Sequence, residues 1–306
     1  MKNISVIIVT YNGMKWIQKC LESVLNSSVI CEITVIDNNS TDETVSYIKS
    51  KHPGIILLEQ TQNLGFGAAN NIGMSYALRN KSDFVFLLNQ DAYLQPQTLS
   101  ILIKAHAQNE GYGVISPIHL NGDGSKLDKN FAGYLKENDT LIFDSLHENY
   151  SKSIYDMSFV NAAAWLIPRK TLEIIGGFDP VFYHYAEDDN YCQRLLFHGF
   201  KIGVVPKCYI YHDRESRLMN SKPSNQYDLI LKERQLKHRW ANINIYINDE
   251  VEERKRYLSK LIAKLFIKLK FKKANYYKRE LALIERIIPK IYTSRVINKQ
   301  KGTHYL

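Results

Sequence analysis

Apolar runs and amphipathic stretches alternate along the first half of the chain. The apolar runs are rich in β-branched residues, have the length of strands, and read ISVIIVTY, EITVID, IILLEQ and DFVFLLN. Between them, apolar residues recur at helical spacing over residues 16–25, and NSTDETVSYIKS opens a helix behind a capping residue. Continuous apolar strands are buried on both faces. The pattern therefore predicts an α/β fold with a mostly parallel central sheet flanked by helices.

The pattern changes after Ser116. Residues 121–156 are polar and irregular, which predicts a loop-rich insertion or an edge hairpin. SFVNAAAWLIP restores an apolar strand, and KIGVVPKCYIYH predicts one more pair of short strands. Between these segments, HYAEDDNYCQR sets Glu187, Asp188 and Asp189 at the start of a helix. Acids in a first helical turn are favoured by the helix dipole, so helix initiation alone could explain them.

Charge separates a body from a tail. The net charge is +9, but residues 251–306 carry 16 Lys or Arg against 4 acids, so a body of residues 1–250 is slightly acidic. In YLSKLIAKLFIKLKFKK the apolar residues recur at helical spacing, and they are Leu258, Leu261, Ile262, Leu265, Phe266 and Leu269. This pattern predicts a basic amphipathic helix, which is typical of an element that lies on an anionic membrane surface.

The alternative for the tail is a helix that packs on the body or on a second subunit of a homodimer. Nucleic acid is not favoured as a partner, because the basic residues belong to no recognisable nucleic-acid module. The four cysteines are scattered, the N-terminus does not resemble a signal peptide, and nowhere do about 18 apolar residues run uninterrupted. We therefore expect a cytoplasmic protein whose membrane contact, on the inner face of the cell membrane, is peripheral.

Polar residues follow the predicted strands. An open α/β sheet binds its ligand at the carboxyl ends of its strands. Here those ends carry Thr10-Tyr11-Asn12, Asp37-Asn38-Asn39 and Asn89-Gln90-Asp91. Neither G-x-G-x-x-G after the first strand nor G-x-x-x-x-G-K-[ST] occurs, which argues against a dinucleotide dehydrogenase or a P-loop enzyme. Short polar side chains and carboxylates suit a nucleobase, a ribose and a metal-bound diphosphate.

Five motifs together resemble one family. SVIIVTYN, VIDNNSTDET, NLGFGAANNIG, LLNQDAYL and GGFDPVFYHYAEDDNYCQR follow the order and spacing of the family 2 glycosyltransferases, whose fold is GT-A, the nucleotide-diphospho-sugar transferase fold. The resemblance is greatest to bacterial rhamnosyltransferase-like members that build cell-surface polysaccharides. It implies a catalytic domain over residues 1–250, with a nucleotide-binding part to about residue 118 and an acceptor-side part from about residue 119. Residues 251–306 form a helical basic extension.

The resemblance assigns donor-binding residues. It places Thr10, Tyr11 and Asn12 against the nucleobase, and it gives Asp37 the carboxylate that accepts a hydrogen bond from a pyrimidine N3–H. The further donor candidates are Asn39, Asn63, Gly65, Asn70, Asn89 and Gln90. For Gly65, which permits a tight turn, packing of a helix on the sheet is an equally good explanation.

LLNQDAYL stands where the family carries a D-x-D or a single Asp that holds a divalent cation between the donor phosphates. Asn89 replaces the first acid, so Asp91 is the candidate ligand for Mg²⁺ or Mn²⁺. One or two protein carboxylates plus phosphate suffice for such an ion. His212, which ends CYIYH, is the second candidate, although a histidine at a strand end can also be structural.

The acids of HYAEDDNYCQR align with the family's catalytic pair. Displacement at an anomeric carbon needs a base on the face opposite the leaving nucleotide. Asp188 aligns with that base and Glu187 with its neighbour, while Asn190 stands where the family's E-D-x-D-L has a second Asp. We expect Arg194 to tie this helix to the body. Trp165 is either a wall of the sugar pocket or a core aromatic residue.

The resemblance thus implies an inverting glycosyltransferase. Its donor would be a nucleoside-diphosphate sugar of the dTDP-rhamnose or UDP-sugar type, and its acceptor a hydroxyl of a glycan or a lipid-linked molecule. Asn89 and Asn190 leave open a catalytically silent scaffold that binds a nucleotide sugar. A sugar nucleotidyltransferase is not favoured, because TYNGMKW lacks the Gly-rich, Lys- or Arg-bearing loop that such an enzyme needs.

Overall fold

The computed structural model describes residues 2–214 and 225–306 and separates into two compact units. One unit comprises Met1–Met219 with Lys301–Leu306, and the other comprises Asn220–Gln300. The division along the chain therefore falls before the boundary that we placed after residue 250. The reason is that helix α9 (Asn225–Trp240) packs on α11 (Phe271–Asn298) and so belongs with the helices of the tail.

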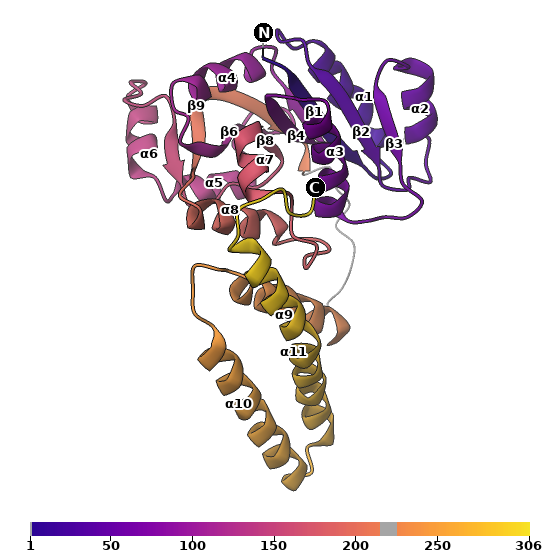
Figure 1. The fold of residues 1–306 in the computed structure, drawn as a ribbon, viewed down its shortest axis with the longest axis vertical. Helices are drawn as coiled ribbons and strands as arrows, with labels where there is room; N and C mark the ends of the chain where they lie inside the picture. The colour runs from indigo at the N-terminus through magenta and orange to yellow at the C-terminus, as the bar shows by residue number, and fades with distance from the viewer. Residues whose placement is uncertain (1, 215–224) are drawn as a thin grey trace. The chain divides into compact units, whose positions relative to one another are not determined.

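In the described part of the first unit, nine strands form one mixed sheet (Figure 1). They are β1 (Ile4–Thr10), β2 (Glu32–Asp37), β3 (Ile56–Glu59), β4 (Phe84–Asn89), β5 (Ala92–Leu94), β6 (Tyr112–Asn121), β7 (Tyr155–Met157), β8 (Ala164–Pro168) and β9 (Lys201–His212). The order is β3-β2-β1-β4-β8-β6-β9-β5, and β7 pairs with β9. The first four are parallel, as predicted, and β6 is parallel to β9. The other pairs are antiparallel.

Helices cover both faces of this sheet. One apolar core includes residues of α1 (Met14–Leu25), α2 (Thr44–Lys51) and α4 (Thr98–Ala107). The other includes residues of α3 (Phe66–Arg79), α5 (Lys129–Leu135), α6 (Asp139–Leu146), α7 (Arg169–Ile175) and α8 (Glu187–Phe197). Successive residues of a strand point to opposite faces. In β1, Val6 and Ile8 accordingly face the first core and Ile7 the second. Burial on both faces explains the continuous apolar runs.

The prediction of a loop-rich segment over residues 121–156 is wrong. This segment contains α5, α6 and β7, and the two helices bury Phe131 and Leu141 against the second core. Each helix begins at a capping side chain: Asp128 accepts from the backbone N of Phe131 at 2.9 Å, and Asn138 accepts from that of Leu141 at 2.9 Å. The helices have 7 and 8 residues, which is too short for a clear helical period in the sequence.

The prediction of two short strands in KIGVVPKCYIYH is also wrong, because this segment is the single strand β9. Its pairing with β6 shifts register between Pro117 and Ile118. Lys207 lies within this irregularity with φ of +57°, which is the geometry of a bulge. The bulge interrupts the alternation of the sequence without ending the strand.

The second unit consists, in its described residues, of α9, α10 (Asn248–Ile267) and α11. α10 and α11 pack together, with Leu258 of α10 and Ile284 of α11 fully buried. The predicted amphipathic helix therefore ends at Ile267, and part of its apolar stripe is covered. In the part of the chain that the structure describes, no helix is both long and apolar enough to cross a membrane.

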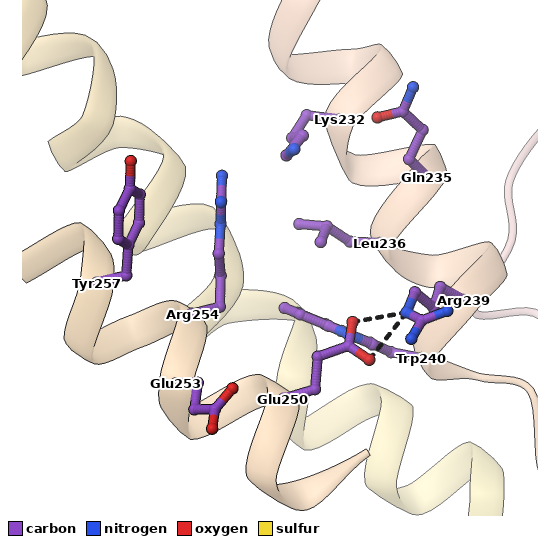
Figure 2. A pocket seen from close by; sticks show the side chains of 9 residues that line it. All are labelled: Lys232, Gln235, Leu236, Arg239, Trp240, Glu250, Glu253, Arg254 and Tyr257. Carbon is purple, nitrogen blue, oxygen red and sulfur yellow. Dashed lines mark hydrogen bonds and ion pairs between the residues drawn. The ribbon is translucent and has the colours of Figure 1, made fainter. Parts of the chain in front are cut away.

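A groove of about 470 Å³ lies within the second unit, and Figure 2 shows the side chains that line it. Its lining residues are Lys232, Gln235, Leu236, Arg239, Trp240, Glu250, Glu253, Arg254 and Tyr257. Glu250 accepts from Arg239 Nε at 2.6 and 2.8 Å and from Trp240 Nε1 at 2.9 Å. The hydrogen bond from Arg239 is the main reason that the pKa of Glu250 lies below its usual range. These contacts join α9 to α10, so we assign the charges of this groove to helix packing.

Gly73 sets how closely α3 approaches the sheet. A Cβ atom at this position would lie 2.5 Å from Ile7 Cγ2 and 2.9 Å from Ile36 Cδ1. We predict that Gly73→Ala lowers the free energy of unfolding by about 1–2 kcal/mol, because overpacking outweighs the gain in helix propensity. Gly111→Ala, where a Cβ meets nothing within 4 Å, is the control. Denaturant unfolding checks both variants, and equal stability of Gly73→Ala and wild type would contradict this close approach.

Candidate functional site

The carboxyl ends of three parallel strands meet at one edge of the sheet. Thr10 pairs in register with Asp37, and Val9 pairs with Asn89. Gln90, half-buried after β4, joins two of these ends: its Oε1 accepts from Thr10 Oγ1 at 2.7 Å and from the backbone N of Tyr11 at 3.0 Å. The structure thus brings together the polar strand ends that the sequence suggested.

Asp37 has one satisfied and one free carboxylate oxygen. The side chain is 2% exposed, and its Oδ2 accepts from the backbone N of Ser40 at 3.0 Å. Its Oδ1 is buried and has no hydrogen-bond partner among the described residues. A buried charged oxygen without a donor is costly, so this atom is suited to accept a hydrogen bond from a ligand. The contact of Asp37 with a nucleobase N–H, which the sequence motifs imply, stays a prediction.

Asn12 and Asn39 shape the loops behind these strand ends. Both adopt left-handed backbone conformations, with φ of +46° and +68°, which Asn tolerates better than most residues. The Asn12 carboxamide oxygen accepts from the backbone N of Thr41 at 2.8 Å, and the Asn12 backbone N donates to Ser40 Oγ at 2.9 Å. Asn12 therefore links two loops, and Tyr11 beside it is 46% exposed and available to a ligand.

Asn63 and Gly65 form a tight turn that Asn38 holds. Asn63 Oδ1 accepts from Asn38 Nδ2 at 3.0 Å and from the backbone N of Gly65 at 2.9 Å. Gly65 has φ of +82°, and a Cβ here would lie 2.1 Å from the carbonyl oxygen of Tyr183. Glycine is thus required for a close approach of the loop after Phe178, and not for packing of a helix on the sheet.

Asn70 and Asn71 are both buried in α3. The Asn70 amide donates to the carbonyl of Phe66 at 2.9 Å, so one side of this predicted ligand is engaged by its own helix. Asn71, which the sequence analysis missed, donates to the carbonyl of Phe178 at 2.8 Å and accepts from its backbone N at 2.7 Å. Asn71 therefore positions the segment that leads to Asp188.

The two predicted metal ligands face each other. Asp91 follows β4 and His212 ends β9, and the side chains are 1% and 0% exposed. Asp91 Oδ1 lies 3.5 Å from His212 Nε2, and Asp128 Oδ2 lies 3.5 Å from His212 Nδ1. Arg214 Nε lies 3.6 Å from the same oxygen of Asp128. A carboxylate at the second ring nitrogen is how proteins commonly orient a metal-binding histidine.

This donor set fits a divalent cation that also binds phosphate. No group of three or more His, Cys, Asp or Glu side chains in the described ranges is arranged to hold a metal. One carboxylate and one imidazole are nevertheless sufficient when substrate phosphates complete the coordination. The sequence analysis did not find Asp128. Its neighbours in the sequence indicate only a helix cap, and its contact with His212 joins residues that are far apart in the chain.

Two aromatic side chains near the Asp91–His212–Asp128 cluster, His119 and Tyr134, have shifted pKa values. Burial holds the pKa of His119 well below its usual range, and the neighbouring His212 and Arg214 lower it further. Burial also raises the pKa of Tyr134 to about 12, and the charge of Asp188 adds to this, as do those of Asp128 and Asp189. Tyr134 thus lies within the field of both the metal-candidate cluster and the acids of α8.

α8 begins at Glu187, so all three acids occupy its first turn, as predicted. Glu187 is buried, and the half-buried Asp188 accepts from the backbone N of Asp189 at 3.0 Å. Burial, followed by the negative charge of Asp189, raises the pKa of Asp188 to about 6. Such a carboxylate is mostly ionised at neutral pH and still has an appreciable proton affinity, which suits a general base.

Aromatic residues precede these acids. Tyr183 is 62% exposed and Tyr185 is 51% exposed. Tyr185 and Ala186 both have φ of +69°, a conformation that non-glycine residues rarely adopt and that costs on the order of 1 kcal/mol or more each. The fold holds this strained turn directly before Glu187, the first residue of α8, and such strain is concentrated at functional sites.

Three further residues of this region belong to the core. Arg194 is 1% exposed and donates to the carbonyl of Gly177 at 2.7 Å, which confirms that it ties α8 to the body. Trp165 is fully buried with its ring centroid 6.0 Å from that of Phe178, so it is a core aromatic residue. Asn190 is fully buried as well.

Residues 5–167 match the family described as Glycosyl transferase family 2. The chain belongs to this family. It is 24% identical over 207 residues to the low-salt glycan biosynthesis hexosyltransferase Agl10 of Haloferax volcanii, a match that covers 66% of this chain and 64% of that relative. It is 22% identical to the dTDP-rhamnosyl transferase RfbF of Shigella flexneri, over 69% of each chain. An N-acetylglucosaminyl-diphospho-decaprenol L-rhamnosyltransferase of Mycobacterium tuberculosis is 23% identical, over 68% of this chain and 75% of the relative.

Solved structures of GT-A glycosyltransferases confirm the predicted fold. The S. aureus TarS fragment 1–349 in complex with UDP-GlcNAc matches with a TM-score of 0.58 at 15% identity, over 98% of this chain and 88% of that one. The Pyrobaculum calidifontis mannosyltransferase PcManGT, in complex with GDP-Man and Mn²⁺, matches with a TM-score of 0.54 at 18% identity, over 95% and 75%. At these identities the likeness shows the fold alone.

The paired hydrogen bonds of Asn71 lead to a prediction. We expect Asn71→Ala to lower the free energy of unfolding by about 2–3 kcal/mol, because it leaves a buried backbone N–H and a buried carbonyl of Phe178 without partners. Asn70→Ala, which removes one hydrogen bond within its own helix, should cost about 1 kcal/mol. Denaturant unfolding of the two variants gives the comparison, and an equal loss for both would contradict the positioning role of Asn71.

Proposed function

We propose that this protein is an inverting glycosyltransferase that moves a sugar from a nucleoside-diphosphate donor to an acceptor hydroxyl. The observation that carries the proposal is Asp188 in the first turn of α8, with a pKa of about 6, in the same electrostatic neighbourhood as the Asp91–His212–Asp128 cluster. The negative charges of Asp188 and of Asp128 both raise the pKa of Tyr134, which supports a base and a candidate diphosphate site in one region of the fold.

The donor base would lie at the ends of β1 and β2. There the free Oδ1 of Asp37 accepts the N3–H of a pyrimidine, and the exposed ring of Tyr11 covers the base. A pyrimidine agrees with the dTDP-rhamnose or UDP-sugar donors that the sequence motifs imply, and the relative from Shigella is a dTDP-rhamnosyl transferase. Asn12 and Asn39 fix the loops around the base through their left-handed backbones.

Asp91 and His212 would hold a divalent cation, Mg²⁺ or Mn²⁺, with Asp128 orienting the imidazole. When bound, the cation offsets the charge that develops on the departing diphosphate. A role for these residues in metal binding is supported by their burial and mutual distance, and PcManGT was solved with Mn²⁺.

Asp188 performs the proton chemistry. The acceptor oxygen attacks the anomeric carbon from the face opposite the diphosphate, the bond from that carbon to the diphosphate oxygen breaks, and Asp188 takes the hydroxyl proton. The configuration at carbon is inverted. We propose a hydroxyl of a glycan or lipid-linked acceptor, because the mycobacterial relative is named for a diphospho-decaprenol acceptor. The exposed rings of Tyr183 and Tyr185 supply a surface on which such an acceptor can rest.

A catalytically silent, donor-binding scaffold is the alternative. Asn89 in place of the first acid of the metal motif favours it, since a single carboxylate remains there. Asn190 also keeps this alternative open: its side chain is fully buried, and neither its amide nitrogen nor its amide oxygen has a hydrogen-bond partner among the described residues. Donor binding without release of nucleoside diphosphate from any of a panel of dTDP-rhamnose and UDP-sugars would support the scaffold and contradict the transferase.

Asp188→Asn should retain the fold and donor binding but reduce transfer by about two to four orders of magnitude, which is the usual effect of losing a general base. Asp189→Asn is the matched control and should lower transfer far less, because its role is to raise the pKa of its neighbour. Release of dTDP or UDP in the presence of acceptor measures both. Turnover near that of wild type in Asp188→Asn would remove this residue from the mechanism.

The pH profile of the same reaction gives a separate prediction. The base must be deprotonated, so kcat/KM for wild type should fall about tenfold per pH unit below pH 6 and level off above it. Asp189→Asn removes a neighbouring negative charge and should shift this limb to lower pH. A profile that is flat between pH 5 and 7 would contradict the assignment of Asp188 as base.

Asp91→Ala should abolish the dependence of nucleoside-diphosphate binding on metal, because Asn89 leaves no second acid in this motif. Titration calorimetry of UDP and dTDP with and without Mn²⁺ measures this. Asp37→Asn is the control: it should weaken binding through the base and preserve the response to metal. If Asp91→Ala still responds to Mn²⁺ as wild type does, the cation is held by other residues.

A further inference from the structure

The turn between α10 and α11 carries an unbalanced positive charge. Residues 254–279 contain 11 Lys or Arg and no Asp or Glu, and the turn Lys268 to Lys270 lies in the middle of this stretch. Figure 1 shows this turn at the end of the hairpin that the two helices form. Six exposed lysines surround it, and they are Lys260, Lys264, Lys268, Lys270, Lys272 and Lys273. None of these six forms an ion pair with a residue that the structure describes.

Large apolar side chains are exposed among these lysines. Phe266 is 44% exposed, Ile267 83%, Leu269 73% and Phe271 54%, and the rings of Phe266 and Phe271 lie 5.9 Å apart. We call residues 264–273 the hairpin tip. Single exposed apolar residues are ordinary, but a contiguous group of four marks an interaction surface.

The backbone of the tip gives a second, independent indication. Lys270 N donates to Leu265 O, and Leu269 N donates to Phe266 O, both at 2.9 Å, which is a Schellman motif at the end of α10. The residue in the left-handed position of this motif is usually glycine, but here it is Leu269 with φ of +53°. A leucine costs about 1 kcal/mol there relative to glycine. Leu269 is 73% exposed, so burial does not offset this cost, and contact with an apolar partner would.

We propose that the hairpin tip inserts into an anionic lipid surface. Its apolar side chains would enter the boundary between headgroups and acyl chains, while the lysines reach the phosphates of the headgroups. A second copy of this chain is a poor occupant, because the lysines of two tips would repel each other. Nucleic acid would satisfy the lysines but would leave Ile267 and Leu269 exposed.

The proposed membrane contact is smaller than the one predicted from the sequence. The sequence pattern suggested that the whole amphipathic helix lies on the membrane, whereas here only the hairpin tip contacts it. Leu258, at the start of the predicted stripe, is fully buried between α10 and α11, so the stripe is not available as a whole. Only its end, beyond Leu265, is exposed together with Phe271 of the next helix. This proposal is independent of the proposed transfer reaction, since an inactive protein tests it equally well.

Co-sedimentation of the full-length chain tests the proposal. The vesicles are equimolar phosphatidylcholine and phosphatidylglycerol, and pure phosphatidylcholine, each at low and high salt. Wild type should bind the anionic vesicles at low salt and bind them less at high salt. The variant Ile267→Ser/Leu269→Gly should lower the partition coefficient about tenfold or more, because each buried CH₂ that is lost weakens insertion.

Two comparisons separate insertion from other effects. Val296→Ser removes an apolar side chain that is 62% exposed elsewhere on α11, and it should bind vesicles as wild type does. Leu269→Gly alone is the variant that the backbone favours, so it should fold at least as well as wild type and still bind more weakly. Lys268→Gln/Lys270→Gln should weaken binding to the anionic vesicles at low salt.

Three results would overturn the proposal. The first is a wild-type protein that does not sediment with anionic vesicles at low salt. The second is unchanged sedimentation of both Ile267→Ser/Leu269→Gly and Leu269→Gly. The third is a wild-type oligomer in light scattering that these substitutions dissociate without an effect on vesicle binding, which would make the tip a subunit interface.

Discussion

Burial of the sheet on both faces is the constraint on which the site depends. Helices cover each face of β1, β2 and β4, so these strands can present chemistry only where they end. The parallel register brings three ends to the same edge, which places the end of β1 at Thr10 between Asp37 of β2 and the segment after Asn89 of β4. The polar residues of the site are therefore adjacent because of the hydrogen-bond ladder, before any side-chain contact is considered.

The carboxylates of the site differ because their surroundings differ. Asp91 is buried with its Oδ1 3.5 Å from Nε2 of the His212 imidazole, whereas Asp188 has the carboxylate of Asp189 next to it and a raised pKa. Asp37 has one oxygen held by its own loop and one left without a donor. The same side chain is thus suited to coordination, to proton transfer or to recognition of an N–H group, according to what burial leaves around it.

In the second unit, pairing of two helices divides an apolar stripe into a covered and an uncovered part. α10 and α11 pack together where Leu258 is fully buried, while the chain reverses after Ile267 and leaves Phe266, Ile267 and Leu269 exposed. The dense lysines keep this end hydrated and positively charged. A surface that is both apolar and basic suits the interface of an anionic bilayer better than water or a second protein surface.

The sequence by itself determined the alternation of strands and helices, the parallel half of the sheet and the start of α8 at Glu187, because continuous apolar runs and first-turn acids are local signals. Its family motifs also led to Asp91 and His212. Only the tertiary structure decided that Asp128 faces the second nitrogen of His212. It alone also showed that Asn71 clamps Phe178, since these partners are 84 and 107 positions apart. Likewise, the amphipathic period predicted a helix in the tail, but period alone cannot show which side of that helix another helix covers.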